Sequence, residues 1–348
     1  MRNDFVMPLI RWYEQEHRRD MPWRQNPTPY RVWISEIMLQ QTRIDAAIDH
    51  FLRFCDRLPN VAALASVSDD ELMKLWEGLG YYSRARNLKK AAGIVMEQYG
   101  GKLPRNYDQL LALPGVGEYT AGAIASIAYG LPVPAVDGNV MRVLARLTDC
   151  HEDVMLPALR KQFRLELEGI MPKQAGSFNQ GLMELGERVC LPNTAPRCDA
   201  CPIAEYCDAY KRGTQNELPV RVVKTKRRIE QKTVLVIRAV KDGKAYVLLH
   251  KRPANGLLAG LWELPNVDGA LNRLPASCAV VRELPAGKHV FSHIEWKLSG
   301  LLIDAPYGTP PTDYIWADAE GLRDTYALPT AFQTYSKQLP TLLSNKGE

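Results

Sequence analysis

Four of the seven cysteines lie within eighteen residues and have the spacing of metal ligands. Seven residues separate Cys190 from Cys198, two separate Cys198 from Cys201, and five separate Cys201 from Cys207. Thiolates are soft ligands that favour zinc or an iron–sulfur cluster, and the spacing alone leaves both metals open. The segment lacks the paired C-x2-C knuckles common in zinc sites, and four unrelated buried cysteines are the weaker alternative. We therefore predict a metal centre between Cys190 and Cys207.

Two glycines and a carboxylate earlier in the chain could bind an anion and stabilise a cation. Leu113-Pro114-Gly115-Val116-Gly117 lies between two stretches of helical periodicity, and its glycines let backbone amides approach a phosphate. Twenty residues later, Asp137 directly precedes another helical stretch and is predicted to be its N-cap. A carboxylate at a helix N-terminus stays ionised, which suits the stabilisation of a cationic sugar. The alternative for the two glycines is a plain turn between helices that binds no phosphate. For Asp137, the capping role and the stabilisation of a cation are compatible.

Helices must position these residues, and strands must build the rest of the chain. Apolar residues recur at helical spacing over residues 5–188, with almost nothing typical of a strand. Residues 233–240 and 245–250 are predicted to be strands joined by a hairpin turn at Asp242-Gly243. Further strands are predicted at 296–303 and 313–316, and a closing helix at 331–339. The charged, aperiodic segment 208–231 between the two regions is predicted to be an exposed linker.

Length and composition limit the class of protein. At roughly 150 residues per domain, 348 residues correspond to about two domains. The net charge of +5 permits a polyanionic partner without requiring one. The longest uncharged stretch, 119–136, is interrupted by glycine and proline, so we predict no membrane span. The N-terminus lacks the features of a secretory signal and the odd number of cysteines disfavours a disulfide framework, which together indicate a cytosolic protein.

The hairpin, Asp137 and the cysteine segment together resemble the helix-hairpin-helix DNA glycosylase superfamily, in its branch that carries a [4Fe-4S] cluster. Within that branch, WISEIMLQQT at 33–42 and GLGYYSRAR at 78–86 are similar to the MutY family of adenine DNA glycosylases. That family removes adenine mispaired with 8-oxoguanine, and its members carry a C-terminal domain related to Nudix hydrolases. In the family, six residues commonly separate the first two cluster cysteines. We expect the extra residue here to bulge in the loop.

The resemblance covers nearly the whole chain and implies a multidomain protein. Residues 1–207 would form an all-α helix-hairpin-helix glycosylase region with an iron–sulfur loop, divided into a six-helix module at about 23–134 and an iron–sulfur module at about 1–22 plus 135–207. An α+β Nudix-like domain that recognises 8-oxoguanine would follow at 232–345. The cofactor implied is a [4Fe-4S] cluster on the four cysteines. The partner implied is duplex DNA with 8-oxoguanine:adenine or guanine:adenine mispairs, bound by a cytoplasmic, nucleoid-associated monomer of bacterial type.

Cleavage of an N-glycosidic bond requires a proton for the departing purine and negative charge near the developing sugar cation. The resemblance implies that Glu36 protonates adenine N7 and then guides the attacking water, that Asp137 stabilises the sugar cation, and that Asn139 positions sugar and water. From periodicity alone, Glu36 flanks the apolar stripe of its helix and is predicted to be a solvated surface acid. A catalytic acid at neutral pH also needs a raised pKa, which burial could supply.

The substrate base must be rotated out of the duplex, so further residues must hold both bases of the mispair. By resemblance, Gln41, Leu79 and Tyr81 contact or wedge beside 8-oxoguanine, and Arg24 and Gln180 hold the flipped adenine. HVFSH at 289–293 resembles the loop that recognises 8-oxoguanine. Helix-end packing and an incidental serine at a strand end are the alternatives. The predicted DNA contacts are Arg24, Gln41, Thr42, Leu79, Tyr81, Gly115, Gly117, Gln180, Phe291, Ser292 and His293.

Two absences in the sequence bear on the reaction. Bifunctional relatives carry a lysine nucleophile two residues after the second hairpin glycine, where this chain has Tyr119, which we include among the catalytic residues. We therefore predict a monofunctional glycosylase. The glutamate-rich Nudix helix is also absent, because Ala286 and Gly287 occupy the positions of its metal-binding glutamates, so the C-terminal domain is predicted to bind without hydrolysing. An endonuclease III-type glycosylase/lyase and a non-catalytic lesion-binding protein remain the alternatives.

Overall fold

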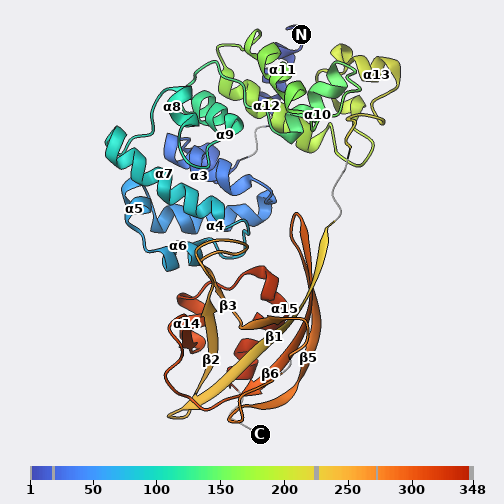
Figure 1. Cartoon of the computed structure of the whole chain (residues 1–348). Coiled ribbons are helices and arrows are strands. Elements are labelled where there is room, and N and C mark those ends of the chain that lie inside the picture. Colours follow the sequence, from blue (N-terminus) through green and yellow to red (C-terminus); the bar gives the residue numbers. More distant parts are fainter. Residues whose placement is uncertain (1, 18–19, 223–226, 272, 345–348) are drawn as a thin grey trace. The chain divides into compact units, whose positions relative to one another are not determined.

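The computed structural model describes residues 2–17, 20–222, 227–271 and 273–344 (Figure 1). The chain divides into two compact units. The first comprises Met1–Ser66 with Arg86–Val223, and the second comprises Val67–Ala85 with Lys224–Glu348. Within the described ranges, each helix is too short or too polar to span a bilayer.

The first unit is helical, as the periodicity predicted. Its first helices are α1 (Val6–Trp12), continued by a π-helical turn (Tyr13–His17), then α2 (Pro22–Gln25), α3 (Pro29–Leu39), α4 (Ile44–Arg57) and α5 (Val61–Ser66). The helices that follow are α7 (Ser83–Tyr99), α8 (Tyr107–Leu111), α9 (Glu118–Ala123), the π-helical segment Ile124–Ala128, α10 (Gly138–Leu147), α11 (Pro157–Glu168), α12 (Ala175–Arg188) and α13 (Asp208–Arg212).

The N-terminal helix packs against the last part of the unit. Leu9 and Tyr13 share a buried cluster with Leu144 of α10, Phe163 of α11 and Phe178 of α12. All of these side chains are at most 2% exposed. Burial of such a cluster is the main source of stability for short helices, since few of them would persist in isolation. The start of the chain is thereby joined to residues 136–207, which carry Asp137 and the four cysteines.

The prediction of an exposed linker over 208–231 is wrong for its first part. Helix α13 packs on α10, and Leu218 is only 2% exposed. Arg146 donates from Nε to the Leu218 carbonyl at 2.9 Å, and Val154 N–H donates to the Val220 carbonyl at 3.1 Å. Charge-rich residues surround these few apolar anchors, so the composition of the segment concealed them. Residues 223–226 of the predicted linker lie outside the described residues.

The second unit contains one sheet, seven-stranded over the described residues, with the order β3-β2-β1-β6-β5 and with β4 paired to β1 and β7 to β2. Strand β1 runs parallel to β6, and the other pairs are antiparallel. The strands are β1 (Arg228–Lys241), β2 (Lys244–Lys251), β3 (Trp262–Glu263), β4 (Asn266–Asp268), β5 (Ala279–Val290), β6 (Ile294–Asp304) and β7 (Tyr314–Ala317). The predicted turn at Asp242-Gly243 is confirmed, with φ of 51° and 75° at the two residues, as a two-residue hairpin requires.

Strands β3, β4 and β5 of the second unit were not predicted, and its C-terminal helix also differs from the prediction. Strand β5 was not predicted, because bulges between Val280 and Arg282 and between Leu284 and Gly287 break the alternation of apolar and polar residues. The single helix predicted at 331–339 is wrong. The chain instead forms a 3-10 turn (Thr330–Phe332), α15 (Gln333–Ser336) and a separate α16 (Leu339–Ser344). Pro340 has no backbone N–H, which favours a new helix start at this point.

Helix α6 (Asp69–Leu75) belongs to the second unit through its contacts, although it falls within the predicted 23–134 module. The Asp70 carboxylate accepts hydrogen bonds from Lys251 Nζ and, at 3.2 Å, from Trp262 Nε1. Glu77 Oε1 accepts a hydrogen bond from the Leu328 N–H at 2.8 Å. Hydropathy periodicity does not encode these polar pairs. They explain why this segment groups with strands far along the chain.

Candidate active site

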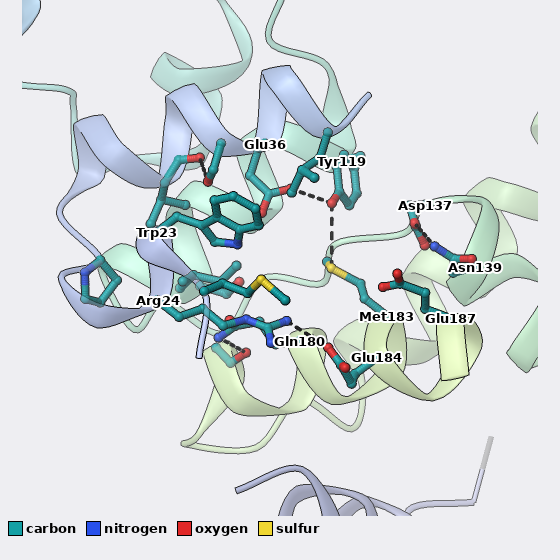
Figure 2. Close-up of a pocket in the computed structure, with 18 of the residues that line it drawn as sticks. Trp23, Arg24, Glu36, Tyr119, Asp137, Asn139, Gln180, Met183, Glu184 and Glu187 are labelled. Carbon is teal, nitrogen blue, oxygen red and sulfur yellow. Dashed lines mark hydrogen bonds and ion pairs between the residues drawn. The ribbon is translucent and has the colours of Figure 1, made fainter. Parts of the chain in front are cut away.

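A cavity of about 980 Å³ in the first unit collects the predicted catalytic residues (Figure 2). Glu36 enters it from α3, Tyr119 from the start of α9, and Asp137 and Asn139 from the start of α10. The predicted adenine contacts Arg24 and Gln180 and the predicted DNA contacts Gln41 and Thr42 also line the cavity. The fold therefore brings together eight predicted residues that span 157 positions of the sequence from Arg24 to Gln180, both included.

Glu36 is buried, with 6% of its surface exposed, which corrects the prediction of a surface acid made from periodicity alone. Helix α3 begins with Pro29 in its first turn and is capped by Thr28, whose hydroxyl accepts a hydrogen bond from the Arg31 N–H. These features fix where the helix starts and hence which face carries Glu36. The other elements around the cavity then cover that face.

The environment of Glu36 raises its pKa to about 7. Burial is the main cause, the negative charge of Asp137 adds to it, and the hydrogen bond from Tyr119 and the charge of Arg24 oppose it. The Tyr119 hydroxyl donates to Glu36 Oε2 at 2.5 Å. Burial and the two carboxylates raise the pKa of Tyr119 well above its usual value, so the phenol keeps its proton. A carboxyl group with a pKa near 7 can act as an acid and then as a base at neutral pH.

Asp137 is the N-cap of α10, as predicted. Its Oδ1 accepts a hydrogen bond from the Val140 N–H at 2.8 Å, and its Oδ2 accepts one from Asn139 Nδ2 at 2.9 Å. Burial raises the pKa of Asp137 above its usual value, although these hydrogen bonds and the nearby Arg142 oppose the shift by stabilising the ionised form. Asp137 is thus a partly buried carboxylate held in one orientation at the cavity wall.

Arg142 was not predicted, yet it holds Asn139 in place. Its Nη2 donates to Asn139 Oδ1 at 2.9 Å and to the Gly186 carbonyl at 2.8 Å, and its Nε donates to the Cys190 carbonyl at 2.8 Å. Gly186 must lack a side chain here, because a Cβ atom would lie 2.7 Å from the Cβ of Asn139. The only sequence signal for this contact was that Arg142 and Arg146, one turn apart, interrupt the apolar face of 138–147.

Glu184 is a second residue that sequence reasoning missed. Its side chain is fully buried and its Oε2 lies 3.0 Å from Arg24 Nη2. The Arg24 guanidinium also lies over the Tyr13 ring, 5.5 Å from the centroid. Gln180 is one helical turn earlier on α12 and donates from Nε2 to the Gly176 carbonyl at 3.2 Å. The spacing of four residues from Gln180 was the available signal, since it places Glu184 on the same helix face.

The four predicted metal-binding cysteines line one pocket beside α10 and α12. Arg146 donates from Nη1 to Cys190 Sγ at 3.2 Å. Burial and the neighbouring sulfurs raise the pKa of Cys201 to about 12. Deprotonation of several of these thiols together would need a positive centre, and an iron–sulfur core of one iron per cysteine fits this set of donors. In the described ranges, no three His, Cys, Asp or Glu side chains converge on the position of a single ion. The loop between Cys190 and Cys198, where we expected the extra residue to bulge, contains Asn193 in a left-handed backbone conformation, with a φ of 57°.

The predicted phosphate-binding hairpin forms a tight turn between α8 and α9. Gly115 has a φ of 77°, and a Cβ atom there would lie 2.7 Å from the Cβ of Asn87. Gly117 is extended and precedes α9, with open space where a side chain would project. Only glycine suits the first position, whereas the second leaves the backbone accessible to a ligand.

Two predicted DNA contacts have a backbone conformation that is rare outside glycine. Gln41, just beyond the end of α3, has a φ of 58°, and Tyr81, in the second unit, has a φ of 45°. Such strain often marks functional positions. Tyr81 is 50% exposed, so its ring is accessible. Leu79 is only 6% exposed, so its side chain is not presented at the surface. Thr42 donates from Oγ1 to the Gln40 carbonyl at 3.4 Å.

The predicted 8-oxoguanine loop is the turn between β5 and β6. The Phe291 N–H donates to the Ile294 carbonyl at 2.8 Å, which closes the turn and leaves Ser292 and His293 exposed. The Phe291 ring packs edge-on against Trp296 and His289, with centroid distances of 4.9 and 4.5 Å. The loop thus exposes a serine and a histidine beside the packed rings of His289, Phe291 and Trp296.

Comparison with protein families identifies both regions. Residues 34–172 match the HhH-GPD superfamily of base excision DNA repair proteins, and residues 233–338 match the NUDIX domain. The adenine DNA glycosylase of Mus musculus is 36% identical in an alignment 379 positions long, gaps included, and the alignment covers 90% of this chain and 73% of that protein. The adenine DNA glycosylase of Buchnera aphidicola from Schizaphis graminum is 38% identical over 265 residues, which cover 76% of this chain and 75% of that protein.

Solved structures resemble the helical unit. A thermostable thymine-DNA glycosylase is 30% identical with a TM-score of 0.55, covering 60% of this chain and 95% of that chain. Endonuclease III in a trapped covalent intermediate with DNA is 26% identical with a TM-score of 0.50, covering 60% of this chain and 94% of that chain. The predicted fold class, a helix-hairpin-helix glycosylase region followed by a Nudix-like domain, is confirmed.

Proposed function

This chain belongs to the adenine DNA glycosylase family, and on that premise we propose that it excises adenine paired with 8-oxoguanine, with Glu36 as general acid. It is a monofunctional N-glycosylase of base excision repair that removes adenine. The observation that carries the proposed mechanism is the burial of Glu36 beside Tyr119 in the cavity that also holds Asp137.

Glu36 supplies the proton to adenine N7. Tyr119 occupies Oε2, and Oε1 has no hydrogen-bond partner among the described residues, so the transferable proton sits on Oε1. With a pKa of about 7, a large fraction of the free enzyme carries this proton at neutral pH. Positioned general acids of this kind contribute about 10²- to 10⁴-fold to a rate. After the purine departs, the resulting carboxylate orients the attacking water.

Asp137 stabilises the sugar as positive charge develops on it. Its ionised form is favoured by two hydrogen bonds and by its place at the start of α10. A fixed anion interacts strongly with a developing cation and needs no reorganisation during the reaction. Asn139, held by Arg142, keeps Oδ2 of Asp137 in its orientation.

Recognition of the mispair divides between two groups of residues. Arg24 and Gln180 line the cavity and would hold the flipped adenine, while Gln41 and Thr42 at its rim would contact the DNA beside it. In the second unit, Ser292 would contact 8-oxoguanine, supported by Phe291 and His293, and Tyr81 would stack near the lesion. The 279–290 segment forms strand β5 where a Nudix hydrolase has its catalytic helix, which favours a binding role for this domain.

A [4Fe-4S] cluster held by Cys190, Cys198, Cys201 and Cys207 completes the proposal. When bound, it ties the loops between these cysteines into one ordered segment. Arg146 donates a hydrogen bond to Cys190 Sγ and would in this way support the bound state. Purified protein should be brown and contain about four iron atoms per chain. A colourless protein with one zinc ion would contradict this part of the proposal.

The lyase alternative has one favourable observation, the similarity to endonuclease III. The chain has Tyr119 at the position where that class carries its lysine, and the phenol is engaged with Glu36. A Schiff base with the sugar needs an amine, which a phenol cannot supply. Efficient borohydride trapping of an enzyme–DNA adduct through a lysine in this cavity would support the lyase instead.

The function is tested by single-turnover adenine release from duplexes that differ only opposite the adenine. We expect the fastest release opposite 8-oxoguanine, slower release opposite guanine and none opposite thymine, and strand cleavage only after alkali. Release at equal rates from all three duplexes would contradict recognition of the mispair. Strand cleavage without alkali would contradict a monofunctional enzyme.

Since DNA repair requires access to the chromosome, we further propose that the enzyme acts as a monomer at the nucleoid.

A further inference from the structure

We propose that Arg160 and Arg164 form a subsite for a backbone phosphate of the substrate DNA, beside the catalytic cavity. The subsite is a second cavity of about 270 Å³. The inference rests on the proposed function, because it deepens that function by naming a further contact with the same DNA. It differs from binding by the hairpin amides, since it depends on two side chains of α11.

The position of this second cavity links it to the reaction. Gln40, Tyr119 and Arg160 line both cavities, so the two are neighbours that share a wall. Arg160 donates from Nη1 to the carbonyl of Val136 at 3.4 Å, and Val136 directly precedes Asp137. Because Asp137 lies against the sugar in the proposed mechanism, a phosphate attached to that nucleotide must pass close to Arg160.

The charges of the second cavity favour an anion. Arg160 and Arg164 are one turn apart on α11 and project from the same side of the helix. No carboxylate among the described residues pairs with Arg160, and its only protein hydrogen bond there is the long one to Val136. Arg164 pairs with Glu168 through Nη1, but its buried Nε has no hydrogen-bond partner in the described part of the chain. A ligand that accepts from Arg160 would give its guanidinium hydrogen-bond partners that the described part of the protein does not supply.

Phosphate fits this arrangement better than other anions. Two guanidinium groups offer several N–H donors in fixed planes, which match the several oxygens of a phosphate. The one acid among the lining residues, Glu118, is exposed, so solvent screens its charge. A single carboxylate ligand would leave more of these donors unmatched.

The salt dependence of duplex binding tests the subsite. Each phosphate contact contributes a slope of about 0.9 to the fall of log Kobs with log salt concentration. We expect Arg160→Gln to weaken binding to all duplexes and to reduce this slope by about 0.9, and Arg160→Lys to restore most of it. The matched control is Lys161→Gln, which removes the same charge from the next position of α11, where the side chain is exposed and lines neither cavity.

A second measurement locates the phosphate. Duplexes with a neutral methylphosphonate at one position near the adenine should bind the wild type more weakly. At one position of the methylphosphonate, Arg160→Gln should cause no further loss of affinity, because the neutral group has already removed the contact. An unchanged slope for Arg160→Gln in a variant whose Tm equals that of the wild type would overturn the proposal. The proposal would also be overturned if Arg160→Gln lowered the affinity by the same factor at every position of the methylphosphonate.

Inorganic phosphate distinguishes a DNA contact from a small-anion site. If phosphate raises the Tm of the wild type but not of Arg160→Gln, and the salt slope of duplex binding is unchanged, the cavity binds a free anion and the proposal fails. Failure of the wider function is separate, because it would appear as a wild-type enzyme that releases no adenine. A wild type that releases adenine, with an unchanged slope in Arg160→Gln, refutes only the subsite.

Discussion

We predict that the hydrogen bond from Tyr119 to Glu36 helps to set the pH range of the enzyme. It lowers a pKa that burial raises, and the balance lies at about 7. Tyr119→Phe removes the donor and leaves the ring. A hydrogen bond to a charged group is worth about 1.5–3 kcal/mol, and one pKa unit corresponds to about 1.4 kcal/mol. The pKa of Glu36 should therefore rise by about one to two units, because its ionised form loses this stabilisation.

The consequence is measured in the pH profile of single-turnover adenine release. Glu36 must be protonated to act, so the rate falls as pH rises through its pKa. In Tyr119→Phe this alkaline limb should shift from about 7 to about 8 or higher, while the maximal rate falls because Glu36 is less well oriented. Tyr129→Phe is the control, since that hydroxyl donates to the Leu103 carbonyl outside the cavity. A limb that stays in place or moves to lower pH would refute the assigned role of Tyr119.

Three further outcomes are expected. Ser292→Ala combined with Phe291→Ala should reduce the preference for 8-oxoguanine over guanine opposite adenine, measured as the ratio of single-turnover rates, and an unchanged ratio would remove the loop from recognition. Gly186→Ala should destabilise the protein by about 1–3 kcal/mol, because the added Cβ overpacks the site. Gly93→Ala, in a helix with open space around that position, should stabilise the protein by about 0.5–1 kcal/mol. Equal effects of the two variants on chemical denaturation would contradict the packing argument. Glu36→Gln should stabilise the fold above pH 7, because the pKa of Glu36 lies at about 7 instead of the usual 4.5 and its ionisation favours the unfolded chain as pH rises between these values. The difference corresponds to about 3 kcal/mol, and a Tm below that of the wild type at pH 8 would contradict it.

Local patterns in the sequence predicted the features that depend on local chemistry. The cap at Asp137, the turn at Asp242-Gly243 and the helices of the first unit follow from periodicity and from the preferences of single residues. The crowding of cysteines likewise predicted that all four would line one pocket. Strand β5 could not be predicted in this way, because its bulges remove the two-residue period on which strand prediction depends.

The parts of the site that sequence reasoning missed depend on contacts between distant segments. Glu36 was predicted to be exposed when only its own helix was considered, and elements some 80 to 150 positions later bury it. Arg142 reaches Cys190, and Glu184 reaches Arg24 across 160 positions. No pattern within one helix specifies these partners. The resemblance to a family supplied the proposed role of Glu36, and the fold supplies a physical reason for it, which is a raised pKa.

The central claim is that Glu36 delivers the proton that releases adenine, and Glu36→Gln tests it directly. The variant keeps the shape and the hydrogen bond from Tyr119 but has no proton of suitable acidity to give. Single-turnover release from an 8-oxoguanine:adenine duplex, measured with the enzyme in excess and alongside duplex affinity, separates chemistry from binding. We predict a loss of at least about 10²-fold in rate with affinity within a few-fold of the wild type. Release at a rate close to that of the wild type, or a loss of rate matched by an equal loss of affinity, would contradict the claim.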